Sequence, residues 1–97
     1  SPMLSITYEL YAVALRSESV KKAYEDHFRV HREILVDLIH QGIKGGEFRD
    51  TDAQEVAIAV MAVYQGLILL SAMDPHVVKW EQASKLAVSF SITGLRP

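Results

Sequence analysis

The sequence predicts an all-helical domain of four helices, and three observations support this prediction. Apolar residues recur with the 3.6-residue period of an amphipathic helix along almost the whole chain of 97 residues. The 3 prolines and 5 glycines lie mostly between the periodic segments, where they are expected to punctuate helices. Side chains that cap helices stand at the start of several segments. We therefore expect one antiparallel, bundle-like domain over residues 1–97, a length too short for two independent cores.

The first two predicted helices are separated by Ser17, which can accept a hydrogen bond from the backbone at a helix start. The first helix is expected from about Pro2 to Leu15. Its inward face comprises Leu4, Tyr8, Tyr11 and Leu15. The second is expected from Glu18, whose charge suits the positive end of the helix dipole, to about Ile43. Its inward stripe comprises Val20, Tyr24, His27, Phe28, His31, Leu35, Leu38 and Ile39.

Three glycines and an aspartate mark the boundary between the second and third helices. Gly42, Gly45 and Gly46 are expected to end the second helix, because glycine readily adopts the positive φ of a helix C-terminus. Asp52 is expected to cap the third helix, which extends to about Ala72.

The start of the fourth helix is predicted at Asp74 and Pro75, because proline is favoured at the first helical position. This helix is expected to run to about Thr93. The short connection before it predicts that the third and fourth helices form an antiparallel hairpin. The inward stripe of the fourth helix comprises Trp80, Ala83, Leu86, Ala87 and Phe90.

A run of 18 residues without a charged side chain, Val56–Met73, is about as long as a bilayer-spanning helix. Gln65 interrupts the run, its flanks are acidic, and no basic residue lies between Arg49 and Lys79 to anchor it at a membrane interface. We therefore expect protein, rather than lipid, to cover this helix on all sides. Because the N-terminus also lacks a basic leader, we expect a cytoplasmic protein that does not contact membranes.

The third helix has two apolar faces, of which a four-helix monomer can cover only one well. The second face is small at its centre, where Ala62 and Gly66 would let another helix approach closely. We expect a homodimer in which the last two helices of each chain form a four-helix bundle, the alternative cover being a further segment of the same chain. Burial of this face would contribute roughly 7–15 kcal/mol per protomer, against an association cost of about 4–15 kcal/mol. The predicted interface comprises Ile58, Ala62, Gly66, Leu69, Met73, Val88, Ile92 and Leu95.

His27 and His31 are four residues apart on the second helix, a spacing at which two imidazoles can bind one metal ion. A metal site needs at least one more ligand, and no HExxH or carboxylate pattern identifies one. The sequence therefore predicts no metal site and no cofactor. Besides a metal site, which is the least favoured, two interpretations remain open for the pair: histidines that find hydrogen-bond partners in the core, or residues that contact a bound ligand.

Inward-facing tyrosines are the most informative polar feature of the sequence. A buried tyrosine hydroxyl needs a hydrogen-bond partner, so several of them can line a cavity that offers a few polar contacts. Such a cavity suits a small, mainly apolar ligand or a cation held against aromatic rings, whereas the alternative is a tyrosine-rich core without a ligand. The predicted ligand-binding residues are Tyr11, Tyr24, His27, Phe28, His31, Met61 and Tyr64.

Composition excludes several other functions for these 97 residues. The chain has 10 Lys+Arg against 12 Asp+Glu, which leaves no surplus of positive charge for binding nucleic acid. The absence of cysteine excludes disulfides, thiolate zinc sites and a cysteine nucleophile. The sequence contains no nucleophile motif, phosphate-binding glycine loop or dinucleotide fingerprint, so we expect no enzymatic activity.

Three short motifs resemble a known family. The segment Ile43–Asp52, IKGGEFRDTD, is followed by an apolar helix that contains Gln65-Gly66-Leu67, and then by Met73-Asp74-Pro75. Together they resemble the C-terminal regulatory domain of TetR-family transcriptional repressors, in particular the choline-responsive, BetI-type branch. The resemblance extends over essentially the whole chain, although Gln65 stands where the family usually has aspartate.

The resemblance implies an all-helical domain that binds a small-molecule inducer and dimerises through its last two helices. It also implies that operator DNA is bound by an N-terminal helix-turn-helix domain, which is not within these 97 residues. The alternative function is a helical dimerisation or protein-interaction module that has no small-molecule ligand.

Overall fold

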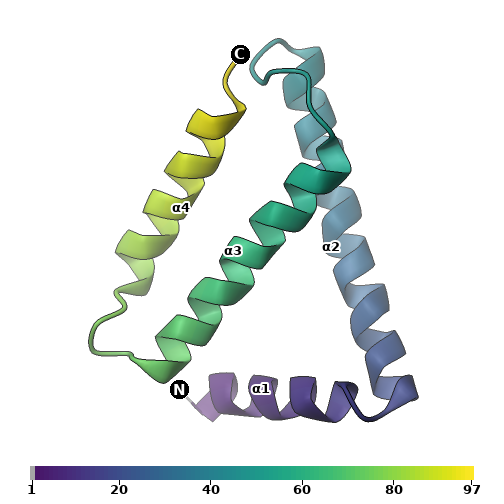
Figure 1. Ribbon diagram of the computed structural model, residues 1–97, viewed down its shortest axis with the longest axis vertical. Helices are drawn as coiled ribbons and strands as arrows, with labels where there is room; N and C mark the ends of the chain where they lie inside the picture. Colours follow the sequence, from purple (N-terminus) through teal and green to yellow (C-terminus); the bar gives the residue numbers. More distant parts are fainter. Residues whose placement is uncertain (1) are drawn as a thin grey trace. The chain divides into compact units, whose positions relative to one another are not determined.

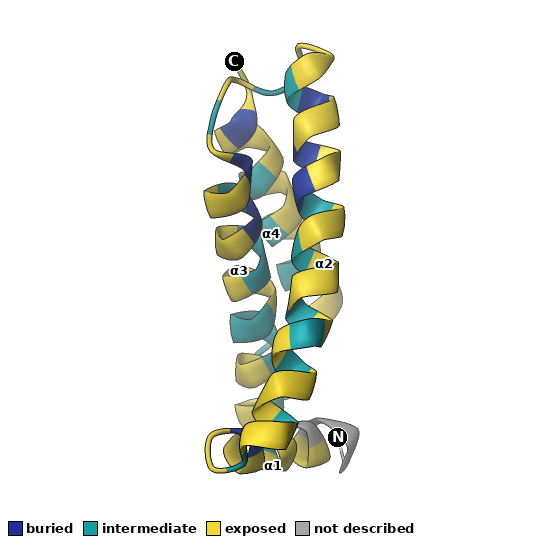
Figure 2. Ribbon diagram, turned by 90° about the vertical axis from the view of Figure 1, so that its right-hand side faces the viewer, coloured by how far each residue is buried: buried dark blue, intermediate teal, exposed yellow. Residues whose placement is uncertain are grey.

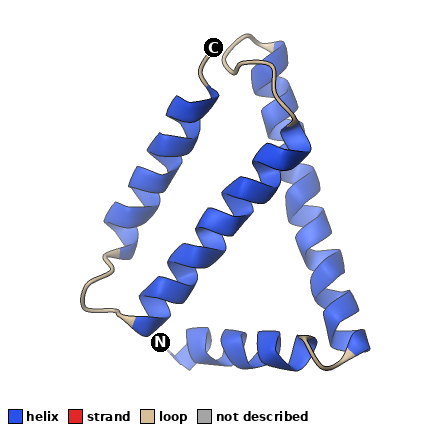
Figure 3. Ribbon diagram, in the orientation of Figure 1, coloured by secondary structure: helices blue, strands red, loops and turns tan. Residues whose placement is uncertain are grey.

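A computed structural model describes the backbone of residues 2–97 and the side chains of residues 5, 6 and 8–97. Helices make up 79% of the chain, and residues 2–97 contain no strand (Figure 3), which confirms the predicted all-helical class. The helices of the described residues are α1 (Pro2–Ala14), α2 (Glu18–Lys44), α3 (Ala53–Met73) and α4 (Trp80–Leu95) (Figure 1).

The chain divides into two compact units, Ser1–His31 and Arg32–Pro97, with the boundary inside α2. The first unit contains α1 and the first half of α2. In its connecting turn, the Val20 N–H lies 3.5 Å from Ser17 Oγ, and the Lys21 N–H donates to the Ser17 carbonyl at 2.9 Å. Leu15, predicted to face inward, is 86% exposed because α1 ends one residue earlier; the side chain of Leu4 lies outside the described residues.

The core of the second unit lies between the C-terminal half of α2 and the first turns of α3 (Figure 2). Val36 and Ile39 of α2 pack with Ala53 and Ala57 of α3, and Ala57 is completely buried. Leu35, Ile43 and Val56 cover this cluster as partly buried neighbours. Leu38 was predicted to face inward but is exposed, because α2 turns Val36 towards α3 instead.

The turn between α2 and α3 depends on two glycines that act differently. Gly46 adopts a φ of 78°, the left-handed conformation predicted for the end of the helix. Gly42, which was predicted to help end α2, instead lies inside it and makes room for an aromatic ring. A Cβ at Gly42 would stand 2.2 Å from Cδ2 of Phe48, so only glycine allows the ring to fold back onto the helix.

The same turn is tied to the end of α4. The Arg49 N–H donates to the Leu95 carbonyl at 2.7 Å, and Arg49 Nε donates to the Gly94 carbonyl at 3.1 Å. The guanidinium therefore satisfies a free carbonyl at the negative end of the α4 dipole. Leu95 is only 8% exposed, because its side chain closes the same end of the α3–α4 hairpin.

The predicted cap of α3 is confirmed. One carboxylate oxygen of Asp52 accepts hydrogen bonds from the Gln54 N–H at 3.0 Å and the Glu55 N–H at 3.2 Å. These bonds satisfy backbone groups that have no partner within the helix.

Replacing Asp52 by alanine is expected to lower the free energy of unfolding by about 1 kcal/mol, because two N–H groups lose their acceptor. Thermal unfolding followed by circular dichroism would measure the loss. Asp50→Ala is the matched control, since Asp50 is exposed and lies before the cap. Equal stability of the two variants would show that Asp52 does not support α3.

Helices α3 and α4 form the predicted antiparallel hairpin (Figure 1). However, α4 begins at Trp80, five residues later than predicted from Asp74 and Pro75. Asp74 ends α3 by donating its N–H to the Leu70 carbonyl, while its carboxylate accepts from the Val77 N–H at 3.3 Å. The aspartate therefore closes one isolated turn and does not start the helix.

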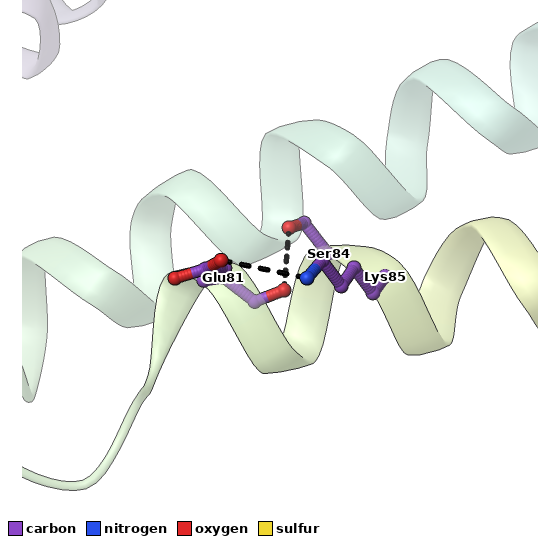
Figure 4. A network of polar contacts seen from close by, with 3 residues as sticks. All are labelled: Glu81, Ser84 and Lys85. Atoms are coloured by element: carbon purple, nitrogen blue, oxygen red, sulfur yellow. Dashed lines mark hydrogen bonds and ion pairs between the residues drawn. The ribbon is translucent and has the colours of Figure 1, made fainter.

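The first turns of α4 carry a small polar network (Figure 4). Lys85 Nζ lies 3.4 Å from the Glu81 carboxylate, and Ser84 Oγ donates to the Glu81 carbonyl at 3.2 Å. The predicted inward stripe of α4 is only partly correct, because two of its residues, Leu86 and Phe90, are exposed. The residues of α4 that face α3 include the small Ser84, Ala87 and Ser91.

Candidate functional site

An aromatic cluster forms where α1 and the first half of α2 meet within the first unit. We define it as Tyr8, Tyr11, Tyr24 and Phe28, all half-buried. The Tyr11 ring meets the Tyr24 ring edge-on, with centroids 4.9 Å apart, and Tyr24 stacks on Phe28 at 5.9 Å. Tyr8 extends the cluster through an edge contact with Tyr11 at 5.7 Å. The structure therefore brings together three of the predicted ligand-binding residues and adds a fourth ring.

Tyr8 was absent from the predicted ligand-binding residues, although its inward position on α1 was a signal for it. Its hydroxyl oxygen is buried and has no hydrogen-bond partner among the described residues. Burial raises the pKa of this hydroxyl above the ordinary value of tyrosine. A buried hydroxyl without a partner is costly, which makes it a point where a ligand could donate or accept a hydrogen bond.

His27 and His31 adjoin the cluster on α2, and both are exposed. The His27 ring meets the Phe28 ring at a centroid distance of 5.7 Å. The two histidines contact each other through Nε2 atoms that lie 3.1 Å apart. The structure thus places the pair at the surface beside the aromatic rings, so the predicted inward position and the interpretation as core histidines are wrong.

An open hollow of about 370 Å³ lies along α2 beside the cluster. Its lining comprises Ser19, Val20, Ala23, Tyr24 and His27. This volume is within the range of small-molecule sites. Ser19 and Ala23 were not predicted, because the hollow arises from their small side chains and not from any chemical motif.

Met61 and Tyr64, the remaining predicted ligand-binding residues, belong to the second unit. Met61 is half-buried on α3. Tyr64 is 53% exposed, and its ring meets Trp80 of α4 edge-on at 5.4 Å. Within this unit, Tyr64 therefore packs in the α3–α4 hairpin.

The second candidate site is an exposed surface of the hairpin, here called the α3–α4 face. It comprises Ile58, Ala62, Gly66, Leu69, Met73, Val88 and Ile92. Its large side chains are substantially exposed, from 41% for Leu69 to 74% for Met73. A Cβ built on Gly66 would meet no atom within 4 Å. Leu95, the last residue of the predicted interface, differs because it is buried within the protomer.

Two further hollows, of about 210 and 140 Å³, lie between α3 and α4. Both are bounded by Val60 and Val63 of α3 and by Ser91 of α4. Side chains from both helices line these hollows, so α3 and α4 do not pack tightly against each other there. Further apolar groups could fill this space.

The chemistry of the described residues is otherwise sparse. They contain no group of three or more His, Asp or Glu side chains placed to hold a metal ion. Asp26 is paired with Arg29 at 3.2 Å on α2. By length and composition α3 could cross a membrane, and only 6% of its apolar window is buried within the chain.

Comparison with known families identifies a family for the chain. The sequence matches the family described as BetI-type transcriptional repressor, C-terminal, over residues 3–91. No curated protein and no solved structure matches the sequence.

Proposed function

Because the chain belongs to the C-terminal domain family of BetI-type transcriptional repressors, we propose that it binds a small-molecule effector and pairs with a second copy. The matched family is one of transcriptional regulators and not of enzymes. In this proposal operator DNA is bound by a separate helix-turn-helix domain, and the protein acts in the cytoplasm. The net charge of −2 agrees with a domain that does not itself grip DNA.

The α3–α4 face supports pairing with a second copy. Large exposed apolar side chains on both helices of the hairpin are typical of interaction sites in water-soluble proteins. Since the large side chains of this face are on average about half covered already, complete burial would contribute about half of the value expected from the sequence, or roughly 4–8 kcal/mol per protomer. A two-fold dimer gains this contribution from both copies, which is comparable with the cost of association.

The small residues at the centre of the α3–α4 face favour a helix as the partner. Ala62 is exposed, and Gly66 has open space where a side chain would stand. Two helices can therefore approach closely there while the larger Ile58 and Leu69 interdigitate around them. The same helix of a second copy offers the complementary small-and-large pattern, which is what a two-fold interface requires.

The aromatic cluster is the observation that carries the effector proposal. Its rings offer apolar surface and negatively polarised faces, and the Tyr8 hydroxyl supplies a polar contact that the described residues leave unused. Such a site suits a small cation or a compact apolar molecule. In the repressor, effector binding at α1 and α2 would change how these helices support the DNA-binding domain.

Choline is therefore expected to raise the melting temperature of the chain, and its neutral isostere, with carbon in place of the ammonium nitrogen, is expected to raise it less. At 100-fold excess over Kd the stabilisation is about 2.7 kcal/mol, which is several degrees for a domain of this size. Differential scanning fluorimetry in the presence of EDTA would measure the shift. Tyr24→Ala is expected to abolish it.

Phe90→Ala is the matched control, because Phe90 is an exposed aromatic residue outside the cluster and the shift should survive its removal. A wild-type chain that responds to neither probe, or a shift that survives Tyr24→Ala, would count against the effector site. A ligand-independent dimer with that outcome would support the alternative of an interaction module.

A further inference from the structure

The structure shows how the two histidine rings on α2 are arranged, which the sequence alone does not. His27 and His31 lie on successive turns, their ring planes are inclined by 82°, and their centroids are 4.3 Å apart. Their Nε2 atoms approach to 3.1 Å, and both side chains are exposed. The two nitrogens therefore meet at one accessible point above the helix.

The contact restricts the protons of the pair. In neutral imidazole one ring nitrogen carries a proton and the other has a free lone pair. A direct contact between two Nε2 atoms needs one proton between them, so at least one of these atoms presents its lone pair to the other. When both rings carry their proton on Nδ1, both Nε2 atoms have a free lone pair. A metal ion that binds both lone pairs can then take the place of the shared proton.

The separation of the two nitrogens fits such an ion. Bonds of about 2.05 Å to nitrogens 3.1 Å apart enclose an angle of about 98° at the metal. This angle lies between the right angle of tetragonal coordination and the tetrahedral angle. Two histidines on successive turns of α2 are therefore close enough to bind one ion.

We propose that His27 and His31 together chelate one divalent ion of the later transition metals, such as Cu²⁺, Ni²⁺ or Zn²⁺. Imidazole nitrogen is a preferred ligand of these ions, whereas Mg²⁺ and Ca²⁺ prefer oxygen. The nearby carboxylate of Asp26 is paired with Arg29, and the described residues offer no third ligand. The ion therefore keeps open positions for water or for a donor atom of another molecule.

The inference rests on the geometry of the two rings and does not require the effector proposal, although the same histidines belong to the proposed effector site. The sequence predicts no metal site because it identifies only two possible ligands, His27 and His31, and no third. The structure adds that the two Nε2 atoms lie close enough together to bind one ion and that both side chains are exposed. An ion held there would also link successive turns of α2 and stabilise this part of the helix.

Calorimetric titration of the 97-residue chain with each metal chloride tests the proposal. We expect one ion per chain, tighter binding of Cu²⁺ than of Ni²⁺ or Zn²⁺, and no binding of Mg²⁺. His27→Ala and His31→Ala should each weaken Ni²⁺ binding by at least about tenfold. His40→Ala is the matched control, since His40 is exposed on the same helix and should leave binding unchanged.

A spacing variant separates chelation from the mere number of histidines. Combining His31→Ala with Arg32→His keeps 4 histidines but moves the second ring about 140° around the helix from His27. Binding should stay as weak as in His31→Ala, and electron paramagnetic resonance of the wild-type Cu²⁺ complex should show two equivalent nitrogen ligands. Full affinity in His27→Ala or in the spacing variant would overturn the proposal. Because effector binding is measured with EDTA present, failure of either proposal is visible independently of the other.

Discussion

Gly66→Arg is expected to prevent the proposed dimer from forming and to leave a monomer. The first atom of the new side chain has room, because a Cβ at this position meets no atom within 4 Å. Arginine is also a better helix former than glycine by up to about 1 kcal/mol. At the centre of the α3–α4 face, however, it would block close approach and place an unpaired charge in an apolar interface.

Sedimentation equilibrium would measure the effect. The wild-type chain should sediment as a dimer of the 10.9 kDa chain, and the variant should sediment as the single chain with its helical circular dichroism retained. Gln41→Arg is the matched control, because Gln41 is exposed on α2 and lies outside the face. Retention of the dimer by Gly66→Arg would exclude this face as the interface.

Gly42→Ala is expected to destabilise the second unit by about 1–3 kcal/mol, which corresponds to a fall of several degrees in melting temperature. The new methyl group would overlap the Phe48 ring, whose Cδ2 lies 2.2 Å from the Cβ position. The ring would have to leave the helix, and the turn that Phe48 and Arg49 hold against the end of α4 would loosen. This loss should exceed the gain in helix propensity.

A double-mutant cycle isolates the cause. If the overlap with the ring is responsible, Gly42→Ala should cost much less stability in a Phe48→Ala background than in the wild type. Gly94→Ala serves as a control, because a Cβ at Gly94 meets nothing within 4 Å. An equal cost of Gly42→Ala in both backgrounds would show that the ring is not what requires glycine.

The fold could be predicted where the sequence contains local signals. The helix boundaries at Glu18 and Asp52 follow from capping side chains and charge, which act within one turn. The start of α4 could not be predicted in this way, because an aspartate before proline can end one helix as well as begin the next. The role of Gly42 depends on the Phe48 ring, whose position follows from the whole turn.

Periodicity predicted much of the candidate site as well. It grouped Tyr11, Tyr24 and Phe28, which the structure shows in ring contact. It could not decide which apolar face of α4 would meet α3, and Phe90 is consequently exposed although predicted to face inward. It also could not anticipate that Tyr64 would pair with Trp80, because that contact depends on the register of the hairpin.

Single-cysteine cross-linking tests the central claim, that this regulatory domain pairs through the α3–α4 face, most directly. The chain contains no cysteine, so one introduced at residue 62 or 66 would be the only thiol of each copy. If two copies meet at the small residues, a short bismaleimide should link Ala62→Cys or Gly66→Cys rapidly into a covalent dimer. Gln41→Cys, on an exposed part of α2, should remain monomeric on denaturing gels. Linking of Ala62→Cys and Gly66→Cys no faster than that of Gln41→Cys would contradict the account.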